Sequence, residues 1–573
     1  MNTEHCFSFL CFVPLDASAP KFFGFSEFLA SLALMVLAWT IADVRYRFRV
    51  RTAPLPLQGL TFFLISSIGL LTLLTDLWRA EQWLVPQGNI ISSSGWQAIL
   101  GGLFLLTFLS WAWFAFIRPP RFSKRNAERY AQTLYRFILK GSPVELSIVA
   151  DELSRSAKSL VQNATDRGTL KNNKKDTPLV SAYANDILLL IADKRFCRAI
   201  VETSPGTALA FFQEISKTKK YGIQVSIFSK NLVTIALSNK DSFLFHEAEV
   251  YESGLIGHQK PLSHAMFSNY KMVEAIGTLL DPDIWEKRKW DSDQWEAYCR
   301  VVLLVFRDYV DKEFWSHSSV LYRAIGYIEH AVDDLYKLNE TTTSAWDDDT
   351  LSALRVVMNF IEQAIEILEE KGPKKDIKLR NRERNGIGTF YDHLASMVFE
   401  IIFAASAVRS PVDQCWWIQH NSVWSKIFDF GTLDGPAAKI VKFKVRRLLY
   451  DEICEMKKFP NFKSARILGF CLNVLGLSLR EKDYNSDSKA LHKVVLSWTK
   501  KNYAWLHSYN PRVAEACLVD GLTYDVENAR IVKTYPVEGL RREPHYVYLD
   551  VEKSVSNENP ENGIEQSNQQ ENA

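Results

Sequence analysis

The stretch LQGLTFFLISSIGLLTLLT, Leu57–Thr75, contains no charged residue. A helix of this length crosses a hydrocarbon layer of about 30 Å. Two similar apolar runs flank it: FSEFLASLALMVLAWTIA at Phe25–Ala42 and WQAILGGLFLLTFLSWAWFAFI at Trp96–Ile117. In the last run, Gly101 and Gly102 favour close helix packing, and tryptophans lie towards the ends, as is typical of membrane interfaces. The sequence therefore predicts three N-terminal transmembrane helices; the alternative is three core helices of a soluble domain.

Basic residues near the apolar runs predict an orientation, because they are enriched on the cytoplasmic side. Two clusters follow the first and third runs, whereas the N-terminal tail carries only Lys21 and the second loop only Arg79. The clusters are Arg45, Arg47, Arg49 and Arg51, and then Arg118, Arg121, Lys124, Arg125 and Arg129. We therefore expect a multi-pass membrane protein with its N-terminus outside and its C-terminal domain in the cytoplasm. A prokaryotic inner membrane is the expected location, because no organelle-type presequence is apparent.

The remaining chain reads as mainly α-helical, because apolar residues recur at helical spacing between Gly, Pro and Asn breaks. One example is Trp346–Lys371, whose expected apolar stripe is Leu351, Leu354, Val357, Met358, Ile361, Ile365 and Leu368. Near the C-terminus, Leu522–Val526, Arg530–Tyr535 and His545–Val551 have β character. The fold class is thus three transmembrane helices, then a large cytosolic helical bundle or array, then a small β element.

Composition shifts predict the domain boundaries. The expected parts are an extracytoplasmic tail (1–24), the transmembrane region (25–118), a juxtamembrane helical hairpin (119–164), a linker (165–178), the helical cytosolic domain (179–520), the β element (521–552) and a disordered acidic tail (553–573).

Charge and cysteine content limit the functional classes. The formal net charge of +2 gives no general attraction to nucleic acid, so a nucleic-acid partner is not expected. The eight cysteines show no CxxC spacing, and no phosphate-binding or dinucleotide-binding glycine motif is present, so no cofactor is expected. Cys6 and Cys11 lie in the expected outer tail, where they could pair or remain apolar residues at the membrane edge.

The densest group of polar residues lies between Asp241 and His264. It contains His246, Glu247, His258 and His264, which are metal-ligand types, and a carboxylate beside a histidine is suited to acid–base chemistry. The spacing does not match HExxH. We keep His246 and Glu247 as catalytic candidates and the three histidines as metal candidates, with a surface turn as the alternative.

A second candidate pair is Arg323 and His330, seven positions apart and hence on one face of a predicted helix. The spacing matches the loose arginine–histidine pattern of helical HEPN ribonucleases, but with 11 histidines such pairs arise by chance, and no family membership is inferred. Two basic stretches, Lys371–Arg384 and Lys439–Arg447, are suited to phosphates of lipid or nucleic acid, with solvated surface as the alternative.

No catalytic motif is recognisable, and the sequence therefore favours a sensor or protein-interaction module anchored in a lipid bilayer, with a protein partner or a homo-oligomer. One alternative is a membrane-permeabilising effector of a bacterial defence or toxin system. The other is a membrane-anchored nuclease or metal-dependent hydrolase built on His246 or on Arg323 and His330.

Overall fold

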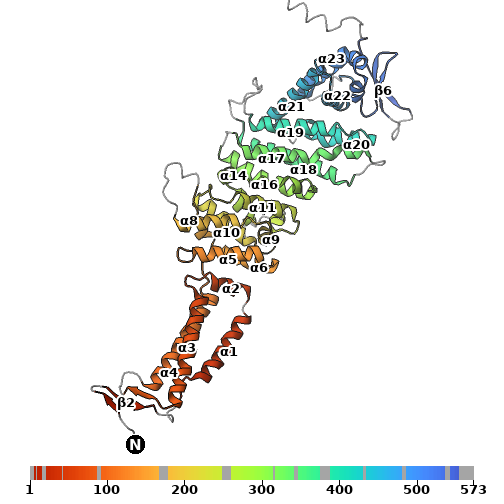
Figure 1. The fold of residues 1–573 in the computed structure, drawn as a ribbon. Coiled ribbons are helices and arrows are strands. Elements are labelled where there is room, and N and C mark those ends of the chain that lie inside the picture. The colour runs from red at the N-terminus through yellow and green to blue at the C-terminus, as the bar shows by residue number, and fades with distance from the viewer. Residues whose placement is uncertain are drawn as a thin grey trace, which may run out of the picture. The chain divides into compact units, whose positions relative to one another are not determined.

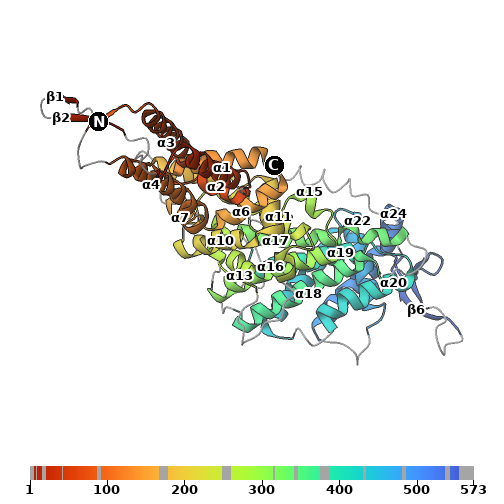
Figure 2. The same ribbon diagram turned by 90° about the horizontal axis from the view of Figure 1, so that it is seen from below.

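The computed structural model describes residues 5–7, 10–15, 21–41, 43–86, 92–166, 178–247, 260–313, 317–340, 346–373, 388–429, 434–479, 486–535 and 543–553. It is mainly α-helical, with a small antiparallel sheet near the C-terminus, as the sequence predicts. The chain divides into two compact units, 1–284 and 285–573, which are described separately (Figures 1 and 2). Most of the predicted linker (167–177) and of the acidic tail (554–573) lies outside the described residues. The other predicted domain boundaries stay predictions.

Two helices of the first unit are long and apolar enough to cross a membrane by length and composition: Leu57–Ala80 (α3) and Ser93–Ile117, which comprises α4 (Ser93–Ala112) and a π-helical turn, η1 (Trp113–Ile117). The first apolar run falls short of that length. It forms α1 (Phe25–Ile41), with 17 residues, and a new helix, α2 (Val44–Arg51), follows because the Asp43 carboxylate caps it by accepting a hydrogen bond from the Val44 N–H at 2.6 Å. By this measure the structure supplies two candidate membrane-spanning helices rather than the three that the sequence predicts.

The helices α1, α3 and α4 lie alongside one another (Figure 1), and small residues allow their close approach. The ring of Phe28 on α1 lies against Gly69 of α3, where an added Cβ would be only 2.7 Å from the ring. Gly101 of α4 lies next to Phe23 in the same way, at 3.2 Å. The shared core of these helices consists of Phe28, Met35, Ile65, Ile68 and Leu100.

A short sheet lies at one end of these helices. Its strands are β1 (His5–Phe7), β2 (Leu10–Pro14) and β3 (Leu84–Pro86), in that order and antiparallel. The backbone register pairs Cys6 with Cys11 and Phe12 with Pro86. The N-terminal tail is therefore joined to the connection between α3 and α4.

The rest of the first unit is a series of short helices. They are α5 (Ala127–Lys140), α6 (Pro143–Ser154), α7 (Ala157–Asn163), α8 (Leu179–Leu190), α9 (Lys194–Thr203), α10 (Pro205–Thr218), α11 (Ser226–Ser238), α12 (Phe243–Glu247), α13 (Pro261–Phe267) and α14 (Tyr270–Ile276). Capping side chains set several boundaries. Ser142 and Glu145 form a capping box at α6, and Asp193 and Asn269 accept N–H bonds at the starts of α9 and α14. The caps at Asp193 and Asn269 start new helices inside the runs 181–201 and 262–280, each of which apolar periodicity alone predicts as a single helix.

The second unit contains longer helices. They are α15 (Ile284–Lys287), α16 (Ser292–Asp311), α17 (Ser319–Glu329), a 3-10 helix η3 (His330–Glu340), α18 (Asp349–Lys371), α19 (Phe390–Ala405), α20 (Val412–Trp417), a π-helix η4 (Ile418–Asp429), α21 (Pro436–Glu455), α22 (Phe462–Leu475), α23 (Ser486–Tyr509) and α24 (Pro511–Ala516). The helix α18 packs between α16 and α21, and its predicted apolar stripe is buried throughout. Full burial of each such side chain contributes about 1.5–3 kcal/mol.

The predicted β element forms a three-stranded antiparallel sheet. Its strands are β4 (Leu522–Asp525), β5 (Arg530–Tyr535) and β6 (His545–Asp550), with β5 in the centre. Ile531 on β5 and Leu549 on β6 are register partners, and both are buried. This prediction is confirmed.

Candidate functional site

The candidate pair of His246 and Glu247 ends the short helix α12. Glu247 is only 2% exposed, and its two carboxylate oxygens accept hydrogen bonds from the N–H groups of Leu262 and Ser263, at 2.7 and 2.6 Å. These N–H groups lie in the first turn of α13, so Glu247 caps that helix. His246 is exposed, and His258 lies outside the described residues. Within the described ranges, no three His, Cys, Asp or Glu side chains are grouped as a metal site would require.

The second candidate pair has local partners. The Arg323 side chain is exposed, and its Nε donates to the Ser319 carbonyl of the same helix at 3.3 Å. His330 is also exposed, and its Nδ1 lies 2.8 Å from a carboxylate oxygen of Asp333. Each of these two contacts is to a residue three or four positions away in the sequence.

The basic helix α21 uses two of its lysines inside the protein. Lys442 and Lys444 are 2% and 6% exposed, and the Lys444 ammonium lies 2.5 Å from the carboxylate of Asp392. This pairing holds the pKa of Asp392 below its usual value, although burial opposes it. Lys442 and Lys444 are therefore not available to a membrane surface. Of the other basic stretch, residues 374–384 lie outside the described residues.

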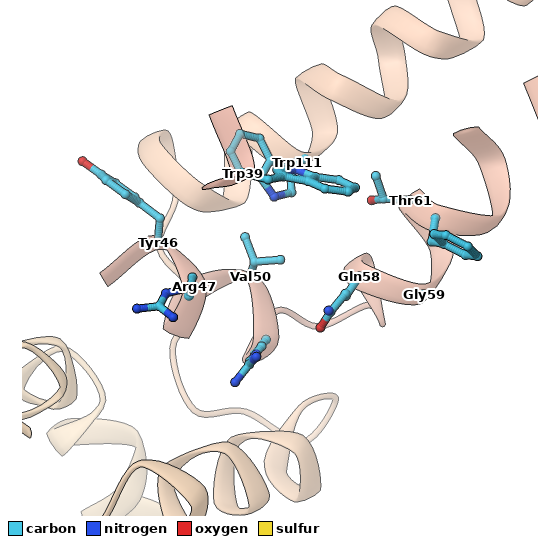
Figure 3. A pocket seen from close by; sticks show the side chains of 10 residues that line it. Trp39, Tyr46, Arg47, Val50, Gln58, Gly59, Thr61 and Trp111 are labelled. Carbon is cyan, nitrogen blue, oxygen red and sulfur yellow. The ribbon is translucent and has the colours of Figure 1, made fainter. Parts of the chain in front are cut away.

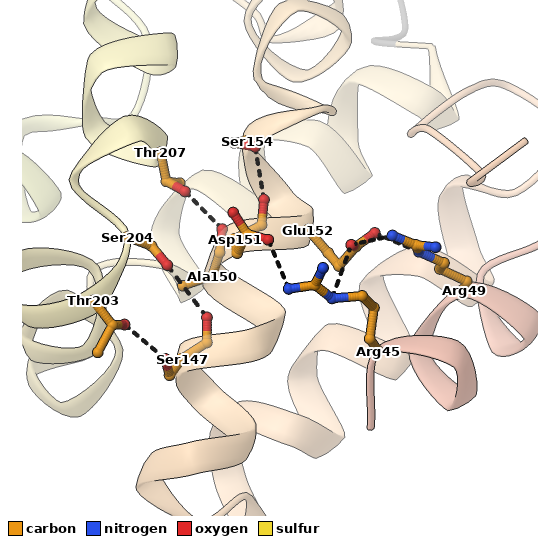
Figure 4. Close-up of polar contacts among 10 residues, drawn as sticks. All are labelled: Arg45, Arg49, Ser147, Ala150, Asp151, Glu152, Ser154, Thr203, Ser204 and Thr207. Carbon is orange, nitrogen blue, oxygen red and sulfur yellow. Dashed lines mark hydrogen bonds and ion pairs between the residues drawn. The ribbon is translucent and has the colours of Figure 1, made fainter. Parts of the chain in front are cut away.

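The most tightly built polar cluster of the first unit joins α2 to α6 (Figure 4). Arg49 is 6% exposed, and its guanidinium donates from Nε and Nη2 to the two carboxylate oxygens of Glu152, at 2.8 and 2.6 Å. Its Nη1 donates to the carbonyl of Ala115 in η1 at 2.9 Å. Glu152 raises the pKa of Arg49 above its usual value. One side chain thus joins α2, η1 and α6, and we call this cluster the Arg49 junction.

Neighbouring contacts extend the Arg49 junction (Figure 4). Arg45 lies 3.0 Å from Asp151 on the surface. On α6, Ser147 donates to the Thr203 hydroxyl at 2.7 Å, and the Ala150 carbonyl accepts from Thr207 at 2.7 Å. The helix α6 therefore contacts both α2 and the segment where α9 ends and α10 begins.

A cavity of about 570 Å³ opens beside the Arg49 junction (Figure 3). Two indole rings, Trp39 of α1 and Trp111 of α4, lie on one side, and Val50 and Arg47 of α2 lie opposite. The remaining lining residues are Tyr46, Arg51, Gln58, Gly59, Thr61 and Phe62. The Trp39 Nε1 is buried and has no hydrogen-bond partner among the described residues. The lining thus combines aromatic side chains with two arginines, Arg47 and Arg51, and includes one buried N–H donor without a partner among the described residues.

A buried polar network supports the C-terminal sheet in the second unit. The Lys533 ammonium of β5 lies 2.5 Å from Asp520 and donates to the Asn473 side chain at 2.6 Å. Asn473 in turn donates to Gln419 at 2.9 Å. Burial lowers the pKa of His420, which contacts the same asparagine, to about 4. The network joins the sheet to α22 and η4.

Four tryptophans of the second unit are exposed within the described residues, including Trp285 at 68%. Trp346, Trp416 and Trp417 are 41%, 42% and 45% exposed, and the rings of Trp346 and Trp417 meet edge to face at 5.8 Å. We call these three residues the aromatic patch. By contrast, Trp290, Trp295 and Trp424 are buried in the core.

Sequence reasoning missed the Arg49 junction and the cavity, because their residues come from separate segments of the chain. The signal for the junction was an acidic residue, Glu152, among the apolar positions of a predicted helix that follows an arginine cluster. Comparisons with protein-family models, curated proteins and solved structures find no match.

Proposed function

We propose that this chain is a multi-pass membrane protein whose helical domain acts as a sensor or protein-interaction module. The observation that carries the proposal is the Arg49 junction. It holds α2, η1 and α6 together through one buried ion pair and one hydrogen bond to a backbone carbonyl. Such a contact passes a displacement of the membrane helices to α6 rather than absorbing it in a flexible linker.

The exposure of α3 and α4 supports membrane insertion. Core helices of soluble proteins pass the same length test, but they are mostly buried. In α3 and α4, only 33% and 22% of the apolar window is buried by the rest of the protein. Large side chains such as Phe62, Phe63 and Leu106 are 70%, 67% and 61% exposed. Exposure of such apolar side chains to water is unfavourable, whereas contact with lipid acyl chains is not.

The position of α1 supports a third span. At the start of α1, the Phe25 N–H donates to Asp76, near the end of α3; towards its end, Trp39 lines the same cavity as Gln58, near the start of α3. At about 1.5 Å per residue, α1 covers about 25 Å along α3. We infer that α1 crosses the bilayer antiparallel to α3. The N-terminus is then outside and both arginine clusters are cytoplasmic.

The aromatic patch supports a protein partner or a homo-oligomer. Tryptophan is enriched among the residues that dominate binding energy at protein interfaces. The three tryptophans of the aromatic patch expose apolar area that a bound partner would cover.

The test is affinity capture of the full-length tagged chain in mild detergent, with partners and self-association identified by mass spectrometry. We expect a partner, or a second copy, whose recovery falls about tenfold or more in the double variant Trp346→Ala/Trp417→Ala. The matched control is Phe459→Ala, which removes an aromatic side chain that is 72% exposed and lies outside the patch.

Two results would contradict the proposal. Release of the chain from membranes by alkaline carbonate would show that it is not an integral membrane protein. Equal recovery of the partner with the wild type, the patch variant and the Phe459→Ala control would show that the aromatic patch is not the interaction surface.

A further inference from the structure

We propose that the cavity between α1, α2, α3 and α4 is a binding site for one anionic glycerophospholipid of the cytoplasmic leaflet. The inference rests on the membrane topology proposed above. That topology places α2, with its arginines, at the cytoplasmic boundary of the bilayer, so the cavity opens at the depth of the lipid headgroups.

The lining of the cavity has the two chemistries that a phospholipid requires. Trp39, Trp111 and Phe62 supply an apolar wall for the start of an acyl chain. Arg47 and Arg51, one helical turn apart on α2, both line this cavity, and a guanidinium matches a phosphate with paired N–H donors. A volume of about 570 Å³ is within the range of small-molecule sites, and it suits a headgroup with the first part of its chains.

The charges around the cavity favour an anionic ligand. Arg47 lies 3.7 Å from Glu145, a long contact in which both side chains are partly exposed, so its guanidinium can reorient. No acidic side chain among the described residues pairs with Arg51. The cavity lining itself contains no carboxylate. A zwitterionic lipid offers a phosphate but adds a cation, so the site should select lipids with net negative charge.

The indole of Trp39 supplies an independent observation. Its Nε1–H is buried without a partner within the described ranges, and an unsatisfied buried donor is unfavourable. A phosphate or glycerol-ester oxygen in the adjoining cavity would accept this hydrogen bond. The Trp39 Nε1–H therefore favours a ligand that has an oxygen acceptor at the edge of its apolar part.

One glycine allows the cavity to be filled by mutation. A Cβ built at Gly59 meets nothing within 4 Å, so Gly59→Leu places a side chain in the cavity without a backbone clash. Gly102 of α4 is equally open but does not line the cavity, and Gly102→Leu is the matched control.

The experiment is native mass spectrometry of the full-length protein released from nanodiscs that contain phosphatidylcholine mixed with phosphatidylglycerol. We expect one phosphatidylglycerol to be retained in preference to phosphatidylcholine. Retention should fall about tenfold or more in Gly59→Leu and in Arg47→Gln/Arg51→Gln. It should persist in Gly102→Leu and in Arg118→Gln/Arg121→Gln, which removes the same charge outside the cavity.

Each other outcome has a stated meaning. Equal retention of phosphatidylglycerol in all variants, or equal retention of both lipids by the wild type, would overturn the lipid site. Displacement of the lipid by inorganic phosphate alone would show a simple phosphate site and also overturn it. In all these cases the protein still inserts into nanodiscs; failure to insert would instead contradict the proposed membrane function.

Discussion

Arg49 and Glu152 lie 103 positions apart in the sequence and meet in a buried, two-contact ion pair of 2.6 and 2.8 Å. Desolvation makes such a pair costly to break from one side, because the remaining charge is left buried and unpaired. The pair therefore fixes the position of α6 against α2 more by the penalty for separation than by net attraction.

We expect Arg49→Ala or Glu152→Ala to lower the free energy of unfolding by about 3–5 kcal/mol. The double variant Arg49→Met/Glu152→Met should cost less than either, because it leaves no charge behind. Thermal unfolding of the purified protein in detergent measures this. The matched control is Arg47→Ala, whose partly exposed contact with Glu145 is 3.7 Å long and should contribute no more than about 1 kcal/mol. Equal effects of Arg49→Ala and Arg47→Ala would refute the role of the junction.

Close packing of α1 on α3 gives a second prediction. Gly69→Ala would place a methyl group 2.7 Å from the Phe28 ring and should destabilise the protein by about 1–3 kcal/mol through overpacking. Gly59→Ala lies on the same helix with open space around it and should be neutral or slightly stabilising. Thermal unfolding of the two purified variants in detergent measures the difference in their stability. If Gly69→Ala is tolerated as well as Gly59→Ala, α1 does not pack as described.

The cap at α13 predicts different outcomes for two adjacent residues. Glu247→Ala removes the acceptor of two backbone N–H groups and should cost about 1–3 kcal/mol of stability. His246→Ala changes an exposed side chain and should change stability by no more than about 0.5 kcal/mol. Unfolding measurements and metal analysis on the same samples test both. Loss of a bound metal in His246→Ala, with stability unchanged, would restore the metal-site hypothesis for His246.

The half-buried Glu329 predicts a dependence of stability on pH. Burial, and then the neighbouring charge of Glu400, raise the pKa of Glu329 to about 7; Asp333 acts in the same direction and His330 opposes it. The folded state therefore binds the proton more tightly than the unfolded state. The stability that comes from the protonated form is complete below the unfolded pKa of 4.5 and is lost as the pH rises through about 7.

Glu329→Gln should accordingly gain about 1–2 kcal/mol relative to the wild type at pH 8, after allowance for partial solvent exposure, and little at pH 4. Unfolding midpoints across this pH range measure the difference. The control is Glu366→Gln, which makes the same substitution at an exposed position. A difference between Glu329→Gln and wild type that does not change with pH would contradict the assignment.

Periodicity and turn residues were enough to predict the helical class, the apolar stripe of α18 and the C-terminal sheet, because each depends on residues close in sequence. They did not predict the breaks at Asp193 and Asn269, where a side-chain cap ends an otherwise continuous apolar pattern. They also assigned Arg49 to the same cytoplasmic basic cluster as its neighbours. Its burial depends on Glu152 and on the Ala115 carbonyl, neither of which is local to it. The cavity combines Trp39, Arg47 and Gln58 in a similar way, and no spacing rule links them.

The small sheet formed by β1, β2 and β3 constrains how the chain is assembled in the proposed topology. The strand β2 cannot pair with β3 until the N-terminal tail and the connection after α3 are on the same side of the bilayer. The pairing of Phe12 with Pro86 can therefore form only after α1 and α3 have both been inserted. A partly inserted chain would leave the edge of β2 unpaired.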